Sequence, residues 1–348
     1  MKKILIYTDV HFSQYSSILR SQGKTFSTRL EGIIDSLNWA EQTALDNECE
    51  FIICMGDFFD RSFLNAEELS ALQSIKWVSL PHYFLVGNHE VERNMLNKSS
   101  AHALNLVPQI EVISDTKIIS DYTIELAFLP YINESIRQPI ENYLPKNNSN
   151  KKRIVFSHND IKGIQYGAFQ STMGFELEDI LENSDCFVNG HLHNGSWIVP
   201  NRVLNLGNLT GQNFTEDALQ YKHNVLILNI EDNNYSFQFI ENPYAFNFCK
   251  LGVINNNLPQ LPKNCILSCA TTSDKAYQRL QEILSNNSDV LSYKIIRERN
   301  IHNNTDSEST SDKEEFKPID HNEQFRKHIL ETLGDNEIVR QEIEEILK

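Results

Sequence analysis

The stretch ILIYTDVH at residues 4–11 begins as an apolar run and stops abruptly at an aspartate and a histidine. A continuous apolar run of this length is typical of a short strand that is covered on both faces of its sheet. We therefore predict a buried strand over residues 3–8, with Asp9 and His11 just beyond its carboxyl end. A sheet built on such a strand needs further strands beside it and helices over its faces.

An amphipathic helix is predicted over residues 28–45, after this first strand. Its apolar residues recur every three or four positions and therefore share one face. They are Leu30, Ile33, Ile34, Leu37, Ala40, Ala44 and Leu45. Buried strands are predicted at 51–55 and 82–86, separated by a helix that begins after Asn65, a residue suited to the N-cap position. The residues expected on the inward side of this helix are Leu69, Leu72 and Ile75.

The order of predicted elements indicates an α/β fold, with a layered α/β/β/α sandwich over residues 1–243. Further strands are expected in this part at 122–129, 153–157, 186–189, 203–206, 224–230 and 235–240. Residues 244–302 contain a strand–helix–strand pattern and are predicted to form a small, separate α+β domain. Residues 303–317 are rich in acidic and polar side chains, which is typical of a disordered linker.

A helical tail is predicted over residues 318–348, beyond the linker. Its apolar side chains at helical spacing are Phe325, Ile329, Leu333, Ile338, Ile343 and Ile346. An amphipathic helix in this position has no core of its own to pack on. Two interpretations stay open, because the helix can fold back on its own chain or dock in the groove of a partner.

The composition excludes several classes of protein. The net charge of −16 argues against a general nucleic-acid binder that acts through its bulk field. The first residues lack the pattern of a signal peptide, and no apolar run reaches the length of a membrane span, so we expect a cytoplasmic protein that does not enter membranes. The six cysteines form no CxxC pair and several lie in apolar runs, which favours reduced, buried thiols.

Polar residues that can bind metals follow five of the predicted strands. The motifs are D-x-H at Asp9 and His11, GD at Asp57, GNH at Asn88 and His89, a lone His158, and GHLH at His191 and His193. In open α/β sheets, ligand sites collect beyond the carboxyl ends of the strands. Five such strand ends therefore predict one convergent site.

The chemistry of this set is informative, because it combines two carboxylates, one amide oxygen and four imidazoles without a thiolate. Such a mixed set suits manganese, iron or zinc. A carboxylate can bridge two metals, and Asp57 lies in the middle of the set. Two neighbouring divalent metals activate a water to hydroxide and stabilise an in-line displacement at phosphorus. The seven residues thus predict a two-metal site that hydrolyses phosphate esters.

The order of these motifs resembles the calcineurin-like metallophosphoesterase superfamily from residue 4 to about residue 215. The resemblance implies that one metal is held by Asp9, His11, Asp57 and His193. It implies that the other metal is held by Asp57, Asn88, His158 and His191. His89 is then the catalytic residue that lies over the scissile phosphate and assists the leaving oxygen without binding metal.

Within the superfamily the chain is similar to the nuclease subunit of SbcCD-type complexes, including the phage recombination endonuclease. The similarity rests on the opening strand, on the turn in VLNLGNLTGQNFTED at residues 203–217, on the small domain at 244–302 and on the tail. It implies that the small domain is the capping, DNA-binding domain of that family. It implies a manganese-dependent DNA exonuclease or endonuclease that acts in DNA repair, recombination and replication. It also implies an SMC-like ATPase partner bound through the tail, and a homodimer. The chain departs from the family pattern at Asp60, where some members carry histidine, and at Gly207-Asn208, where they usually carry Gly-Ser or Gly-Thr.

Three alternatives remain: a protein serine/threonine phosphatase with Arg61 as a phosphate ligand, a small-molecule or cyclic-nucleotide phosphodiesterase, and a scaffold without metals. The phosphatase group resembles this chain in GDFFDR and GNHE but lacks GHLH and the appended elements. DNA contacts are expected from Arg20, Lys24 and Arg29, which follow the first motif. A solvated loop and the start of a helix explain these three cations equally well.

Overall fold

The computed structural model describes residues 1–15, 24–93, 95–120, 122–147, 149–166, 169–216, 218–254 and 257–297. The expected DNA contact Arg20, the linker and all six apolar residues of the tail lie outside the described residues. Met1–Arg299 form one compact unit. Of the helices in the described part, none is long and apolar enough to cross a membrane.

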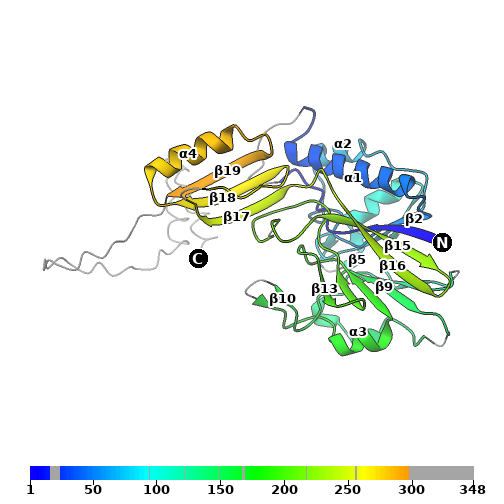
Figure 1. Ribbon diagram of the computed structural model, residues 1–348. Coiled ribbons are helices and arrows are strands. Elements are labelled where there is room, and N and C mark those ends of the chain that lie inside the picture. The colour runs from blue at the N-terminus through cyan, green and yellow to red at the C-terminus, as the bar shows by residue number, and fades with distance from the viewer. Residues whose placement is uncertain are drawn as a thin grey trace, which may run out of the picture. The chain divides into compact units, whose positions relative to one another are not determined.

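The first six-stranded sheet is built around β1 (Lys2–Tyr7), the strand predicted from residues 3–8 (Figure 1). β1 pairs with β2 in parallel and with β15 in antiparallel orientation. The strand order across this sheet is β16 (Asn234–Glu241), β15 (Asn224–Glu231), β1, β2 (Phe51–Cys54), β3 (His82–Leu85) and β6 (Ile110–Ile113). The first three predicted strands are therefore neighbours in one sheet.

The second six-stranded sheet contains the later strands. Its centre is parallel, since β9 pairs in parallel with both β8 and β12. The strand order is β13 (Ser196–Val199), β14 (Val203–Asn205), β12 (Cys186–Asn189), β9 (Arg153–Ser157), β8 (Glu125–Leu129) and β7 (Lys117–Ile119). Two short hairpins also occur, β4 (Val91–Glu92) with β5 (Met95–Ser99) and β10 (Gln165–Tyr166) with β11 (Phe169–Gln170).

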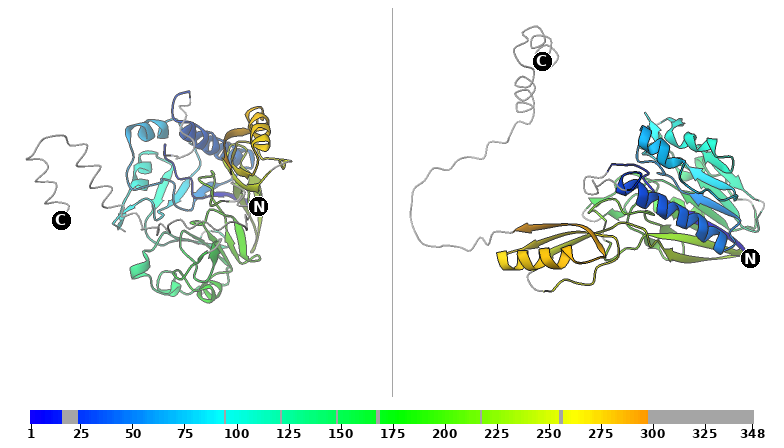
Figure 2. Two further views of the ribbon diagram at one scale, coloured as in Figure 1. Left: turned by 90° about the vertical axis from the view of Figure 1, so that its left-hand side faces the viewer. Right: turned by 90° about the horizontal axis from the view of Figure 1, so that it is seen from above.

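The two sheets pack face to face, and helices cover their outer faces. Strand β1 shows why, because Ile4 and Ile6 enter the core between the sheets while Leu5 and Tyr7 enter the core beneath the helix α1 (Thr28–Asp46). The helix α3 (Leu177–Asn183) covers the second sheet on its far side. Figure 1 shows α1 at the top of the sandwich and α3 at the bottom, and in Figure 2 α1 is seen from above. The predicted α/β/β/α sandwich is confirmed.

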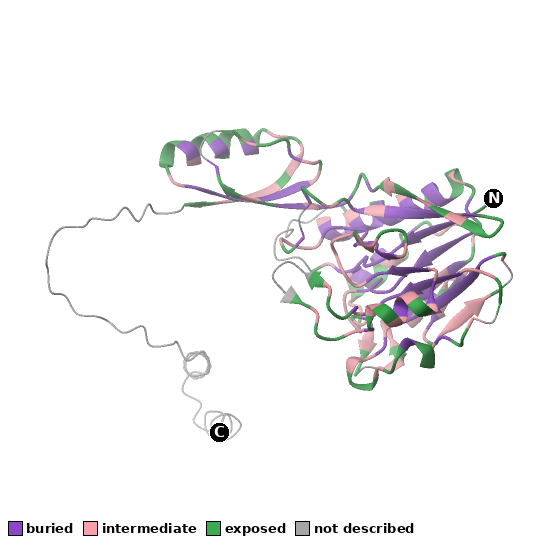
Figure 3. Ribbon diagram, turned by 60° about the horizontal axis from the view of Figure 1, so that its bottom comes forward, coloured by how far each residue is buried: buried purple, intermediate pink, exposed green. Residues whose placement is uncertain are grey.

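The burial pattern follows the layers of the sandwich (Figure 3). All four residues of β2 and all five of β8 and β9 are buried, as the continuous apolar runs predict for strands covered on both faces. By contrast, the edge strand β16 alternates between exposed and half-buried residues. All six cysteines are buried.

The second helix, α2 (Ala66–Leu72), begins as predicted but presents a different face. Asn65 caps it through a capping box with Glu68, each side chain accepting a hydrogen bond from the other residue's backbone N–H. The prediction that Leu69 faces inward is wrong, because 47% of this residue is exposed while Ala71 is buried. The helix ends at Leu72, so the buried Ile75 lies beyond it.

A third, parallel sheet consists of β17 (Asn247–Val253), β18 (Cys265–Thr271) and β19 (Val290–Arg297). The helix α4 (Asp274–Ser285) covers one face of this sheet and contributes Leu280 and Leu284 to its core. These elements contain the predicted strand–helix–strand pattern, but the extra strand β17 was not predicted. The division of the chain at residue 243 stays a prediction.

Several short elements have no clear signal in the sequence. They are β6, β7 and β13, together with the 3-10 helices Ser100–Leu106, Glu134–Ile136 and Ile140–Asn142. Each of these strands has no more than four residues. A segment this short contains too few residues to establish a period.

Candidate metal centre

The seven predicted ligands lie together beyond the carboxyl ends of five strands. Asp9 and His11 follow β1, Asp57 follows β2, and Asn88 follows β3, all in the first sheet. His158 follows β9 directly, and the pair His191 and His193 follows β12, both in the second sheet. Because β1, β2 and β3 are parallel, and β9 and β12 are parallel, each sheet places its ligands at one edge.

The backbone around the site is held in a conformation that L residues rarely adopt. The φ angles are +51° at Asp9, +48° at His11, +49° at Asp57 and +76° at His191. Non-glycine residues with positive φ are uncommon and cluster at functional sites, where the surrounding structure must stabilise them. Gly87 permits the close packing, because a Cβ atom there would overlap with Asp57 Oδ1.

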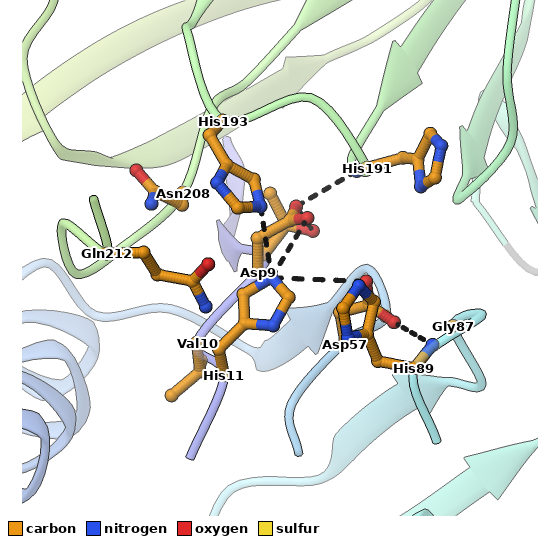
Figure 4. A network of polar contacts seen from close by, with 12 residues as sticks. Asp9, Val10, His11, Asp57, Gly87, His89, His191, His193, Asn208 and Gln212 are labelled. Carbon is orange, nitrogen blue, oxygen red and sulfur yellow. Dashed lines mark hydrogen bonds and ion pairs between the residues drawn. The ribbon is translucent and has the colours of Figure 1, made fainter. Parts of the chain in front are cut away.

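The first group of candidate ligands contains Asp9, His11 and His193 (Figure 4). The Nε2 atoms of the two histidines lie 3.1 Å apart, and His11 Nε2 lies 3.8 Å from Asp9 Oδ1. Asp9 Oδ1 is buried and has no hydrogen-bond partner among the residues that the structure describes. A buried carboxylate oxygen without a donor is costly, and a cation between these atoms would remove that cost.

The second group contains Asp57, His158 and His191, with the amide oxygen of Asn88 between the two rings. Asn88 Oδ1 lies 2.9 Å from His191 Nδ1 and 3.2 Å from His158 Nε2. His158 Nδ1 lies 2.8 Å from the carbonyl oxygen of Met55, which can only accept, so Nδ1 carries the hydrogen. In the neutral ring the lone pair of Nε2 then faces Asn88 Oδ1 and Asp57 Oδ2, the latter at 3.0 Å. Three facing lone pairs fit a bound cation.

Asp57 lies between the two groups. Its Oδ2 atom is 4.0 Å from His11 Nε2 and 3.0 Å from His158 Nε2. Its Oδ1 atom accepts a hydrogen bond of 2.9 Å from the backbone N–H of His89. One carboxylate therefore faces both ligand groups, as a bridging ligand must.

The electrostatics of the site also favour added positive charge. Burial alone would raise the pKa of Asp9, but the histidines around it lower this pKa to about 2. Burial would lower the pKa of His158, yet the neighbouring Asp57 raises it to about 9. The carboxylates are thus held ionised at neutral pH, and they stabilise cations in their midst.

Three of the imidazoles have a carboxylate against their second nitrogen. His193 Nδ1 lies 3.0 Å from Glu216 Oε1, and His11 Nδ1 lies 3.3 Å from Asp60 Oδ1. His191 Nε2 lies 3.3 Å from Asp160 Oδ1. The contact between His193 and Glu216 is a hydrogen bond, and the other two are ion-pair contacts. An outer carboxylate that is hydrogen-bonded to a metal-binding histidine fixes the tautomer and the orientation of the ring and raises its basicity.

The sequence analysis names Asp60 only as a departure from the family pattern, and it does not contain Glu216 or Asp160 as supporting residues. Glu216 is almost fully buried and also accepts hydrogen bonds from the Asn208 side chain at 2.9 Å and from the Gln212 N–H at 2.9 Å. It lies 23 residues beyond His193, and no motif links the two. Asp160 has one weak signal, since it follows His158 by two positions.

His89 lies at the exposed side of the centre. Its ring packs edge-on against His11, with 4.8 Å between the ring centroids. Its Nδ1 atom lies 3.0 Å from the carbonyl oxygen of Asp60, so Nδ1 donates and Nε2 is the nitrogen left to exchange a proton. His89 can also form a ligand group with His11 and Asp57, so the geometry alone allows both roles.

Lys24 and Arg29, the two expected DNA contacts among the described residues, are not part of this centre. Lys24 is exposed, as a phosphate contact must be. Arg29 is only 2% exposed and donates from Nη1 to the carbonyl oxygen of Gly211 at 2.7 Å. Burial lowers the pKa of Arg29 to about 10, opposed by Glu216 and Asp60. In this structure Arg29 therefore stabilises the loop that carries Glu216, which argues against the predicted phosphate contact.

Comparison with known proteins supports the fold and the chemistry. Residues 2–228 match the family model of calcineurin-like phosphoesterases. Two viral relatives are named as candidate phosphoesterases: 078R of Invertebrate iridescent virus 3 is 24% identical over 166 residues, and 244L of Invertebrate iridescent virus 6 is 26% identical over 116 residues. The matches cover 44% and 32% of this chain, and 46% and 40% of the relatives, so the chain spans less than half the length of each.

A solved structure of a dimetal phosphatase from Danio rerio is also similar. It shares 13% identity, covers 69% of this chain and 96% of its own chain, and has a TM-score of 0.42. A likeness at this level says nothing about substrate. The family match, by contrast, extends over more than half of the sequence and includes all seven predicted ligands. The chain therefore belongs to the calcineurin-like phosphoesterase family, whose members use divalent metals.

Proposed function

We propose that this chain is a manganese-dependent DNA nuclease, the hydrolytic subunit of an SbcCD-type repair and recombination complex. The observation that carries the proposal is the pair of ligand groups facing Asp57, with the exposed ring of His89 beside them. Divalent metals held by these groups would activate water and stabilise charge on a phosphate undergoing in-line displacement. Phosphoester hydrolysis is thus the reaction that the site serves.

The part of His89 in this reaction follows from its hydrogen bonds. His89 Nδ1 donates to the carbonyl oxygen of Asp60, and the backbone N–H of His89 donates to Asp57 Oδ1. These two hydrogen bonds hold the ring beside the ligand groups. Because Nδ1 is occupied, Nε2 is the atom that can deliver a proton to the oxygen leaving phosphorus. Asp57 thereby positions His89 as well as facing both ligand groups.

DNA as the substrate is supported by the residues that follow the GHLH motif. The turn within residues 203–217, the strand–helix–strand pattern of residues 265–298 and the place of the tail in the sequence resemble the corresponding parts of SbcCD-type nucleases, although Gly207-Asn208 replaces the usual Gly-Ser or Gly-Thr. The phosphatase alternative needs Arg61 as a phosphate ligand. In the structure Arg61 Nη2 already pairs with Glu68 Oε1 at 2.6 Å, and Nε donates to the carbonyl oxygen of Phe63 at 3.2 Å. A phosphate would have to compete with a buried carboxylate for this guanidinium.

One comparison of substrates tests the proposal. The full chain with manganese is given linear duplex DNA, a single-stranded oligonucleotide, a phosphoserine peptide and a cyclic nucleotide. We expect cleavage of DNA, with the products resolved on a denaturing gel. Turnover of the peptide or of the cyclic nucleotide without cleavage of DNA would refute the nuclease. No turnover of any of them with manganese, iron or zinc would favour the scaffold.

The donors are nitrogen and oxygen atoms without thiolate sulfur, which suits manganese, iron or zinc. Manganese is proposed among these because the chain resembles the manganese-dependent SbcCD-type nucleases. The metal that co-purifies with the chain can be identified by elemental analysis. The chelated protein can then be reloaded with manganese, iron or zinc, and we expect manganese to give the highest rate of DNA cleavage.

The partner is proposed to be an SMC-like ATPase that binds residues 318–348. Deleting residues 316–348 is expected to leave manganese-dependent DNA cleavage unchanged, because all the candidate ligands lie before residue 194. The deletion should abolish co-purification with the ATPase when both are expressed together. Retention of the ATPase by the truncated chain would refute the docking role.

A further inference from the structure

Two exposed aromatic rings stack on one guanidinium at the rim of the metal centre. Tyr15 and Phe63 are 59% and 62% exposed, which is unusual for rings of this size. The Cζ atom of Arg61 lies 4.0 Å from the centroid of the Tyr15 ring and 4.7 Å from that of Phe63. We call these three residues the aromatic platform.

The platform is held by a buried carboxylate. Glu68, which is fully buried, pairs with Arg61 Nη2 at 2.6 Å and accepts a hydrogen bond of 3.0 Å from the backbone N–H of Gln14. Glu68 is also the third residue of α2, where it completes the capping box by accepting from the N–H of the cap Asn65 at 2.9 Å. One side chain thus fixes Arg61, the start of α2 and the segment that carries Tyr15. The guanidinium against which both rings pack, and the backbone just before Tyr15, are therefore held in place before any ligand arrives.

The platform adjoins the reacting end of the metal centre. Arg61 directly follows Asp60, whose carbonyl oxygen contacts His89 Nδ1. Tyr15 follows His11 by four positions, so their Cα atoms are at most about 14 Å apart. The two segments run side by side, since Phe12 forms a parallel β-bridge with Phe59. A substrate strand that places a phosphate beside His89 can therefore reach the rings with a neighbouring nucleotide.

We propose that the aromatic platform binds an unpaired nucleobase of the DNA strand whose phosphate lies beside His89. This inference rests on the proposed nuclease function. Aromatic rings bind single-stranded nucleic acid because every base offers a π-face, and arginine adds a cation–π contribution. Arg61 is paired with Glu68, so the platform selects a flat aromatic partner more than a second phosphate. It would give the enzyme a preference for ends or strands in which a base is unstacked.

The test combines changes in the rings with removal of the base. Single-stranded oligonucleotides carry one abasic residue at successive positions around the cleaved bond, and kcat/KM is measured for each. In the wild type we expect one position at which the missing base lowers kcat/KM by roughly 5- to 140-fold, the range that stacking on a ring supports. In the double variant Tyr15→Ala with Phe63→Ala, the intact strand should lose a similar factor, and the abasic residue should cost nothing further.

Three controls separate stacking from other effects. Tyr15→Phe keeps the ring and should retain the penalty at the abasic position. Phe239→Ala removes another ring, 43% exposed on β16, and should behave as wild type. The manganese content of every variant should equal that of the wild type, which shows that the centre has not been disturbed.

The outcomes distinguish this inference from the proposed function. An equal abasic penalty in the wild type and the double variant, or no penalty in either, would overturn the aromatic platform and leave the nuclease standing. A wild type that cleaves no DNA would overturn both. Loss of manganese from the double variant would assign the rings a structural role and would likewise overturn the inference.

Discussion

Replacing Glu216 with glutamine tests whether a buried carboxylate positions a metal-binding histidine. Glu216 Oε1 lies 3.0 Å from His193 Nδ1, and Asn208 and Gln212 hold the carboxylate in place. Glutamine keeps the size of the side chain but removes the charge that makes the hydrogen bond to the ring strong. We expect the metal bound by Asp9, His11 and His193 to be held more weakly, while the other metal is unaffected.

The magnitude follows from the hydrogen bonds that change. A hydrogen bond to a charged group contributes about 1.5–3 kcal/mol, against about 0.5–1.5 kcal/mol for a neutral pair. The difference of about 1–1.5 kcal/mol corresponds to a loss of about 5- to 12-fold in metal affinity, since 1.4 kcal/mol is tenfold. This agrees with the lower part of the 10- to 100-fold range measured for outer partners of metal ligands. Some loss of stability is also expected, because Glu216 interacts favourably with the buried Arg29.

Manganese is titrated into the full chain after chelation, and calorimetry measures the affinity of each metal site. Urea unfolding of the metal-free chain measures its stability. Glu41→Gln is a matched control, because Glu41 is a buried carboxylate that lies 3.0 Å from His82 Nε2 and outside the metal centre. The control should lower stability and leave both metal affinities unchanged. Unchanged affinity at both sites of Glu216→Gln would refute the reasoning. A loss of metal affinity in Glu41→Gln as large as that in Glu216→Gln would also refute the reasoning.

Three further predictions concern the centre and its surroundings. His89→Ala should abolish DNA cleavage while elemental analysis still finds about two metals per chain; lost metal would instead make His89 a ligand. Gly87→Ala should lower metal content and activity together, because its Cβ would overlap with Asp57 Oδ1, and full metal content would contradict this packing. Burial lowers the pKa of His223 below its usual 6.5, so the unfolded chain binds a proton that the folded chain does not, and stability falls as the pH drops below 6.5. His223→Asn keeps a donor toward the carbonyl oxygen of Asn208. In this variant the stability measured by urea unfolding should depend less on pH between 6.5 and about 5, with the slope reduced by at most about 1.4 kcal/mol per pH unit. An unchanged slope would exclude His223 as the cause.

The local elements of this fold could be predicted from the sequence because their signals are local. The strands β9 and β12 have the predicted bounds, since each is a short apolar run ended by a polar residue. The helix α1 begins beyond the cap Ser27 and buries the predicted apolar face, except for Leu45 in its last turn, which is 44% exposed. The candidate ligands could be identified for the same reason, because each follows a buried strand and the carboxyl ends of parallel strands meet at one edge of a sheet.

Other features were decided only by the tertiary structure. The sequence places Arg29 at the start of a helix, where a cation is usually solvated, yet Phe246 and Gly211 cover it from more than 180 residues away. Leu69 fits an inward helical face, but α2 presents Ala71 instead. The pairing of Glu216 with His193 depends on a loop that no strand pattern fixes. In each case the sequence determines which side chains the chain carries. The burial of these side chains and their partners depend on packing between segments that lie far apart in the sequence, so no single segment can reveal them.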